Sequence, residues 1–180
     1  MAEAVSKTAL YDGLSGLPPL VEQAVALSRR MGFISSCAPA QGRLLQVLAA
    51  GRDGGFIGET GTGCGVGLAW MVSAVGTSTR LISIERDQER AAACQGLFTA
   101  CPNVEVLHGD WRGIITHGPF DLAVLDGGGG KGDNPPADPT ELLVPGGTVV
   151  LDDMHPDLLA TEFRVHPIAG AIVGTRRGTV

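Results

Sequence analysis

Hydrophobic and polar positions along the chain follow two different periods. Apolar residues recur at helical spacing in residues 20–31 and again in residues 39–50, and a glycine follows each segment. Beyond residue 55, short apolar runs alternate with helical segments, which we place at 66–75 and 88–100. The runs predict five strands and then a short edge hairpin: 56–57, 80–85, 104–107, 120–125 and 148–151, followed by 162–165 and 171–175.

Strands that alternate with helices predict βαβ units with right-handed crossovers. The expected fold class is therefore α/β, with a doubly wound, mostly parallel Rossmann-like sheet of about seven strands and two N-terminal helices. The sequence shows no internal repeat, so we expect residues 1–180 to form a single domain. Residues 1–19 end in Gly-Leu-Pro-Pro, which cannot continue a helix, and we expect them to form a loose N-terminal arm.

Composition and charge narrow the possible partners. The net charge is −6 and the pI is about 5.1, whereas a dedicated nucleic-acid-binding protein usually has a basic face. No apolar run approaches the roughly 18 residues of a membrane span. The N-terminal segment carries acidic residues and has no apolar region, so it does not resemble a secretory signal. The four cysteines form no C-x-x-C pair, so we expect reduced, mostly buried thiols in a cytoplasmic protein: Cys37, Cys64, Cys94 and Cys101.

A glycine-rich stretch follows the first strand and opens the next helix. Glu59 precedes glycines at alternate positions, Gly61, Gly63, Gly65 and Gly67. Glycine tolerates positive φ and lets the backbone approach a ligand closely. In a parallel sheet this turn lies at the carboxyl end of a strand, where ligands bind. The pattern predicts a nucleotide-type cofactor site; a glycine-rich surface turn without a ligand is the alternative.

Neither of two common phosphate-binding motifs matches this sequence. A dinucleotide fingerprint needs a small third residue, but the possible frames place Val66, Leu68 or Trp70 there. A P-loop needs Ser or Thr after its lysine, but Gly132 follows Lys131. The remaining pattern, E-x-G-x-G-x-G, resembles motif I of the class I S-adenosylmethionine-dependent methyltransferases. A carboxylate at its start suits a cofactor that carries an ammonium and a sulfonium, and would repel a pyrophosphate.

Polar residues end the second and third strands. The Glu85 carboxylate can accept hydrogen bonds from ribose hydroxyls, although dehydrogenases use the same arrangement and an ion pair with Arg86 or Arg90 is the alternative. The resemblance places Asp110 at the adenine amine, and Trp111 either walls the adenine or packs on the sheet edge. The predicted cofactor-binding residues are Glu59, Gly61, Gly63, Gly65, Glu85, Arg86, Gly109, Asp110, Trp111 and Asp126.

Three carboxylates end the fourth and fifth strands. Asp126 follows one strand and Asp152-Asp153 the other, so all three should meet at one rim of the sheet. Crowded carboxylates are costly unless a cation or a bound proton offsets their charge. Oxygen ligands of this kind suit Mg²⁺, Ca²⁺ or Mn²⁺.

The segments FDLAVLDGG and LLVPGGTVVLDDM resemble the cation-dependent O-methyltransferases, the group that contains the catechol and caffeoyl-CoA enzymes. The resemblance implies a divalent cation held by Asp126, Asp152 and Asp153, a loop at 34–37 that folds over the cofactor, and homodimers, which are common among these relatives. Two features depart from the family pattern. Four glycines separate Asp126 from Lys131, and the segment after Asp153 is short.

The sequence therefore predicts a methyltransferase that uses S-adenosylmethionine to methylate an oxygen of a small hydroxylated molecule. A divalent cation would lower the pKa of the acceptor hydroxyl. The candidate catalytic residues are Asp126, Lys131 and His155, and without a metal His155 or Lys131 would act as general base. Two alternatives remain: an NAD-type oxidoreductase on a similar sheet, and a degenerate methyltransferase fold that serves as an interaction module.

Overall fold

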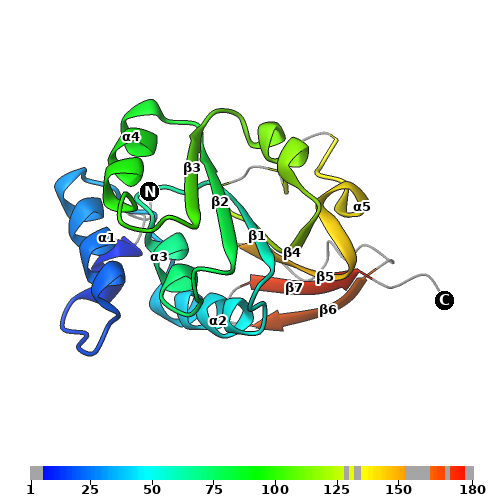
Figure 1. Cartoon of the computed structure of the whole chain (residues 1–180). Coiled ribbons are helices and arrows are strands. Elements are labelled where there is room, and N and C mark those ends of the chain that lie inside the picture. The colour runs from blue at the N-terminus through cyan, green and yellow to red at the C-terminus, as the bar shows by residue number, and fades with distance from the viewer. Residues whose placement is uncertain (1–5, 128–129, 132–134, 153–162, 169–170, 177–180) are drawn as a thin grey trace, which may run out of the picture.

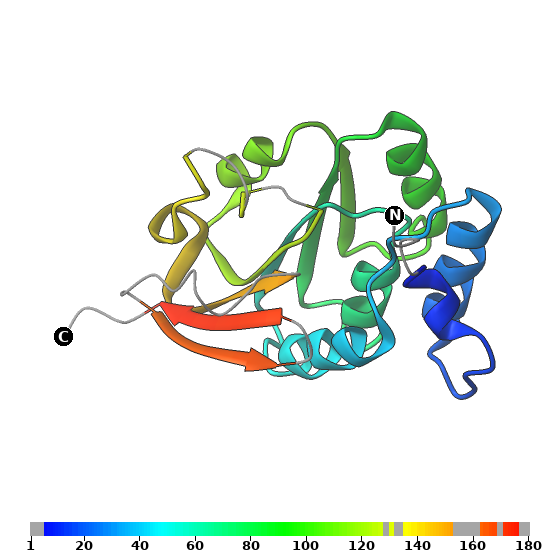
Figure 2. The ribbon, with the colours of Figure 1, turned by 180° about the vertical axis from the view of Figure 1, so that it is seen from behind.

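The computed structural model describes residues 6–127, 130–131, 135–152, 163–168 and 171–176. Seven strands form one sheet in the order β3-β2-β1-β4-β5-β7-β6, in which β1 to β5 pair in parallel and β7 runs antiparallel to both β5 and β6 (Figures 1 and 2). The strands are β1 Phe56–Thr60, β2 Arg80–Glu85, β3 Val104–His108, β4 Phe120–Leu125, β5 Leu143–Asp152, β6 Phe163–Ile168 and β7 Ala171–Arg176. The predicted α/β class, the mostly parallel sheet and the edge hairpin are confirmed.

Helices and 3₁₀ turns connect the strands. They are η1 Thr8–Tyr11, α1 Pro19–Arg30, α2 Pro39–Ala50, α3 Val66–Val72, α4 Gln88–Leu97, η2 Trp111–His117 and α5 Pro139–Leu142. Proline opens α1, α2 and α5, where its missing N–H costs nothing. Asp87 caps α4 by accepting a hydrogen bond from the Arg90 backbone N–H at 2.9 Å. No described helix has the length and apolar character needed to cross a membrane.

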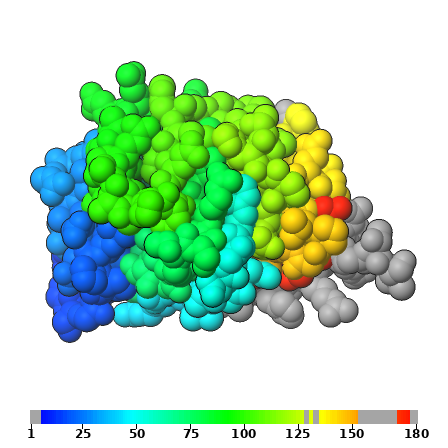
Figure 3. Space-filling model, viewed as in Figure 1, coloured from blue at the N-terminus to red at the C-terminus, as the bar shows by residue number. Residues whose placement is uncertain are grey.

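Neighbouring residues of the strands point to opposite faces of the sheet, and each face has its own core. On β4, Leu122 and Val124 pack under the N-terminal helices, whereas Ala123 and Leu125 face η2 and α5. Both faces are covered, so these strands have continuous apolar runs without alternation. Figure 3 shows the N-terminal residues at one end of the molecule and α5 with β5 at the other.

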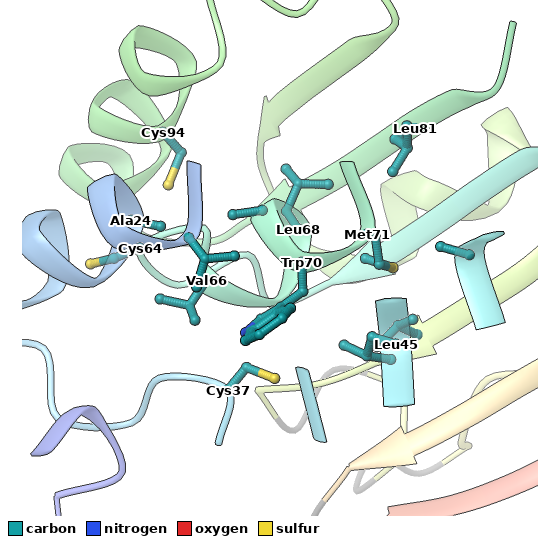
Figure 4. Packing of buried hydrophobic residues seen from close by; sticks show 14 of the residues in the cluster. Ala24, Cys37, Leu45, Cys64, Val66, Leu68, Trp70, Met71, Leu81 and Cys94 are labelled. Atoms are coloured by element: carbon teal, nitrogen blue, oxygen red, sulfur yellow. The ribbon is translucent and has the colours of Figure 1, made fainter. Parts of the chain in front are cut away.

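Trp70 of α3 lies at the centre of the larger core. Its side chain lies close to Cys37 and Leu45 in Figure 4 and is 3% exposed. A Cβ on Gly42 of α2 would lie 2.1 Å from the Trp70 indole nitrogen. Only glycine therefore allows α2 and α3 to pack with the indole between them. The two predicted N-terminal helices thus cover the face of the sheet that carries the glycine-rich turn.

The expectation of a loose N-terminal arm is wrong for the part of it that the structure describes. Thr8–Tyr11 forms η1, and Tyr11 is 3% exposed. The Tyr11 hydroxyl donates to the Cys37 carbonyl at 2.8 Å and accepts from the Trp70 indole N–H at 3.0 Å. Buried aromatic area and two satisfied polar atoms fix this segment to the core.

Several predicted boundaries also differ from the structure. β1 extends to Thr60, so Glu59 belongs to the strand. α3 ends at Val72, and α4 at Leu97, each three residues before the predicted end. β5 begins at Leu143 and includes the predicted turn at 145–147, where Phe120 pairs with Leu143 but Leu122 pairs with Thr148. The extra residues on β5 bulge out of the ladder, which a period-2 pattern does not reveal.

Candidate active site

A cavity of about 720 Å³ lies at the carboxyl ends of the central strands. Nine of the ten predicted cofactor-binding residues line it: Glu59, Gly61, Gly63, Glu85, Arg86, Gly109, Asp110, Trp111 and Asp126. Gly65 does not line it, and a Cβ there would instead lie 2.8 Å from the Phe98 ring on α4. Lys131 also faces the cavity. Asp153 and His155 lie outside the described residues.

The glycine-rich turn brings β1 close to the end of β4. Gly61 has a φ of +80°, and a Cβ there would lie 2.7 Å from the Asp126 carbonyl oxygen. The Gly61 N–H donates to the Ile84 carbonyl at 2.9 Å, which ties the turn to β2 as well. A side chain at Gly61 would therefore push apart three strand ends that meet at the cavity.

Glu59 is buried beneath the first turn of α3. A Cβ on Gly67 would lie 2.8 Å from Glu59 Oε1, so glycine at this helix position makes room for the carboxylate. The Ser83 hydroxyl donates to Glu59 Oε2 at 2.6 Å and lies 2.5 Å from the Thr62 hydroxyl. Burial raises the pKa of Glu59 to about 8, although the bond from Ser83 opposes the shift. The buried carboxyl is therefore mostly protonated at neutral pH.

Glu85 has more partners than the sequence suggested. Its Oε2 accepts from the Gly63 N–H at 2.7 Å, and its Oε1 accepts from the Asp87 N–H and from Arg90 Nη2, both at 2.9 Å. Of the two arginines considered for an ion pair, Arg90 makes it. These bonds hold the turn, the end of β2 and the start of α4 in one arrangement, with 4% of Glu85 exposed.

Asp110 and Trp111 lie where the polypeptide leaves β3. Asp110 caps η2, and its Oδ1 accepts from the Arg112 backbone N–H at 3.0 Å and from Arg112 Nη1 at 3.1 Å. These bonds lower the pKa of Asp110, so this exposed carboxylate is ionised. Trp111 is half-buried and lies 3.3 Å from where a Cβ on Gly130 would stand. Trp111 thus walls the cavity and packs on the loop after β4.

The loop between α1 and α2 forms another wall. Phe33, Ser35, Ser36 and Cys37 line the cavity, which agrees with the position that the resemblance implied for residues 34–37. A Cβ on Gly63 would lie 2.9 Å from the Phe33 ring, and the Arg90 guanidinium lies 5.3 Å from the centre of that ring. Phe33 was not predicted from the sequence, because no motif connects it to residues 30 and 57 positions away.

Asp126 lines the cavity and lies beside Asp152, at the tips of the adjacent strands β4 and β5. Burial and the neighbouring Asp152 carboxylate raise the pKa of Asp126, although the Gly127 N–H donates to its Oδ1 at 2.5 Å. Lys131 Nζ lies 4.0 Å from Asp126 Oδ1 and donates to the Asp152 backbone carbonyl. Among the described residues no group of three His, Cys, Asp or Glu side chains could hold a metal.

Comparison with known proteins places this site in a family. Residues 23–154 match the family model of the protein-L-isoaspartate(D-aspartate) O-methyltransferases. This chain belongs to that family. The matched segment contains every residue found to line the cavity. The prediction of a class I S-adenosylmethionine-dependent methyltransferase of the O-methyltransferase type is thereby confirmed. No match is found among curated proteins.

Solved structures share the fold over nearly the whole chain. An O-methyltransferase from Streptomyces achromogenes that takes part in tomaymycin synthesis, in complex with S-adenosylmethionine, is 20% identical, with 96% of each chain covered and a TM-score of 0.75. An O-methyltransferase from Bacillus cereus, in complex with S-adenosylhomocysteine, is 18% identical, with 97% of each chain covered and a TM-score of 0.74. A methyltransferase from Geobacter sulfurreducens is 19% identical, with 94% and 93% covered and a TM-score of 0.72.

The strand order also separates this family member from the oxidoreductase alternative. A dinucleotide-binding sheet has the order 3-2-1-4-5-6, with all its strands parallel. Here the antiparallel β7 lies between β5 and β6. The missing third glycine in the sequence and the antiparallel β7 in the structure therefore both argue against a dinucleotide-binding sheet.

Proposed function

We propose that the chain transfers a methyl group from S-adenosylmethionine to an oxygen of a small hydroxylated molecule. The observation that carries this proposal is that one cavity joins the glycine-rich turn, Glu85 and the Asp126 carboxylate with Lys131. A volume of about 720 Å³ lies within the roughly 300–1,000 Å³ of sites that hold compounds of this size. The cavity therefore suits the cofactor together with a compact acceptor.

The residues present fit the cofactor. Gly61 and Gly63 line the cavity, and without a Cβ their backbone can be approached closely by a ligand. Glu59 lies at the position suited to a ligand ammonium, and the positive charge of that group would favour the ionised form of the carboxyl. Glu85 offers carboxylate oxygens for ribose hydroxyls, and Trp111 offers an apolar wall for adenine. When bound, the cofactor supplies a methyl group activated by a sulfonium.

Asp126 and Lys131 are the described residues placed for the acceptor. Asp126 lies at the carboxyl end of β4, and its raised pKa lets it take up a hydroxyl proton near neutral pH. The Lys131 ammonium nitrogen lies 4.0 Å from Asp126 Oδ1 and pairs with that carboxylate. The acceptor is thus positioned and deprotonated by groups from the end of β4 and the loop that follows it. His155 stays a sequence-based candidate for the same role.

The described carboxylates do not fit the divalent cation that the resemblance implied. Asp126 has an ammonium group at 4.0 Å, and Asp152 Oδ2 has the ammonium group of Lys7 at 3.8 Å. A divalent cation prefers six or more oxygen ligands and would meet these two positive groups at close range. Asp153, the third predicted ligand, lies outside the described residues. No step of the proposed transfer therefore involves a metal.

The family name supports a second acceptor, the side-chain carboxylate of an isoaspartyl or D-aspartyl residue in a protein. A carboxylate is already anionic and needs no general base. Lys131 would attract it, whereas Asp126 and Asp152 would repel it when ionised. The carboxylate pair therefore favours a neutral hydroxyl over an anionic acceptor.

Calorimetric titration with S-adenosylhomocysteine and, separately, with NAD tests the cofactor assignment. We expect micromolar binding of S-adenosylhomocysteine and none of NAD; the reverse result would refute the proposal. Methyl transfer to catechol and to an isoaspartyl peptide then separates the acceptors. Turnover of the isoaspartyl peptide but not of catechol would identify a carboxylate, and not a hydroxyl, as the methyl acceptor. Binding without any turnover would favour the non-catalytic alternative. The homodimer stays a prediction that light scattering can test.

A further inference from the structure

The N-terminal segment, residues 6–11, packs on the loop that forms one wall of the site. The Thr8 hydroxyl donates to the Phe33 carbonyl at 2.6 Å and lies 2.8 Å from the Ser36 hydroxyl, which in turn donates to Ser28 at 3.0 Å. The Thr8 N–H donates to the Ile34 carbonyl at 3.2 Å. Thr8 and Ser36 are both buried. The segment is therefore fixed to the loop that lines the cavity, as Figure 2 shows for η1 beside α1.

This attachment brings Lys7 to the carboxylate pair. Lys7 Nζ lies 3.8 Å from Asp152 Oδ2, and the Asp152 side chain is 4% exposed. Lys131 reaches the same pair from the loop after β4, at 4.0 Å from Asp126 Oδ1. The chain contains only two lysines, of which Lys7 lies beside Asp152 and Lys131 contacts both aspartates. The remaining eleven of its thirteen basic residues are arginines.

Two aspartates at adjacent strand tips repel each other strongly when buried. A cation between them would remove this repulsion, and so would an ammonium group on each. The lysine ammonium is a compact charge on a flexible side chain. One lysine can therefore approach each aspartate without the fixed planar geometry that an arginine guanidinium requires. Lys7 reaches this position only because Thr8 and Tyr11 hold the segment against the core.

We propose that Lys7 is a positioning residue of the acceptor site and that Lys7 and Lys131 together supply the positive charge for which a divalent cation was predicted. Lys7 holds Asp152 and offsets its charge, which leaves Asp126 to face the acceptor. This inference rests on the proposed function for its meaning in catalysis, but its electrostatic content is testable without an acceptor. Lys7 lies outside the segment that matches the family model.

Binding of Mn²⁺, measured by electron paramagnetic resonance, tests the proposal. In the wild-type chain we expect only weak binding, with a dissociation constant in the millimolar range. The Lys7→Met variant loses the offsetting charge and should bind Mn²⁺ at least tenfold more tightly. Lys7→Arg restores a positive charge and should behave as the wild type. Arg29→Met is the matched control, because it removes the ion pair with Asp12 in the same region, away from the cavity.

The proposal is overturned if the wild type binds Mn²⁺ with a micromolar constant, or if Lys7→Met binds it no more tightly. Titration with S-adenosylhomocysteine keeps the two claims apart. Lys7 does not line the cavity, so each variant should bind this ligand within twofold of the wild type. Loss of that binding in the wild type would refute the proposed function, while the Mn²⁺ result would still decide the role of Lys7.

Discussion

Replacing Glu59 by glutamine tests whether this carboxyl is buried in its neutral form. Glutamine has nearly the same shape, and its carbonyl can accept the hydrogen bond that the Ser83 hydroxyl donates at 2.6 Å. The substitution removes the titratable group and leaves the packing against Gly67 in place. The two proteins should therefore differ mainly in how their stability depends on pH.

The expected magnitude follows from the pKa of about 8, against an ordinary value of 4.5. A group whose pKa is raised on folding contributes most stability below its unfolded pKa and loses it as the pH rises toward the folded pKa. Each pKa unit corresponds to about 1.4 kcal/mol. Between pH 5 and pH 8 the wild type should lose about 3–4 kcal/mol from this group. The Glu59→Gln variant should lose none of it.

Urea denaturation at several pH values between 5 and 8 measures the difference. The stability of the variant relative to the wild type should rise steadily across this range. Glu105→Gln is a suitable control, since Glu105 is an exposed glutamate on β3 and its removal should leave the wild-type profile unchanged. Parallel profiles for the wild type and the Glu59 variant would refute the argument that burial keeps this carboxyl neutral.

Three further substitutions follow from the geometry. Gly61→Ala should destabilise the fold by at least about 3 kcal/mol, and Gly13→Ala by about 1 kcal/mol. Both glycines have a positive φ, but only at Gly61 would the added Cβ meet a neighbouring backbone. Equal urea midpoints for the two variants would contradict this. Tyr11→Phe should cost about 2 kcal/mol by removing the acceptor of the buried Trp70 N–H, and an unchanged midpoint would count against that bond. Glu85→Gln should weaken binding of S-adenosylhomocysteine about tenfold by calorimetry, and an unchanged constant would remove Glu85 from the site.

The sequence by itself determined the order of the elements and the place of the cofactor turn. The alternation of apolar runs and helical segments depends on local periodicity, which each segment shows without reference to the others. The glycines after Glu59 and the acid at Glu85 follow strands directly. In a parallel sheet such residues must lie at one edge, because the carboxyl ends of all its parallel strands meet there. Short-range pattern and sheet geometry were sufficient for these residues.

Only the tertiary structure decided which side chains complete the site. Lys7 stands in a segment without periodicity, and it reaches Asp152 because Tyr11 and Thr8 are anchored to residues 25 to 59 positions away. The choice of Arg90 over Arg86 as the partner of Glu85 depends in the same way on how α4 packs. These contacts depend on the packing of distant elements, which no local pattern records. The sequence brought Asp126 and Asp152 to one rim and named Lys131 as a candidate, whereas the approach of Lys7 to Asp152 appears only in the folded chain.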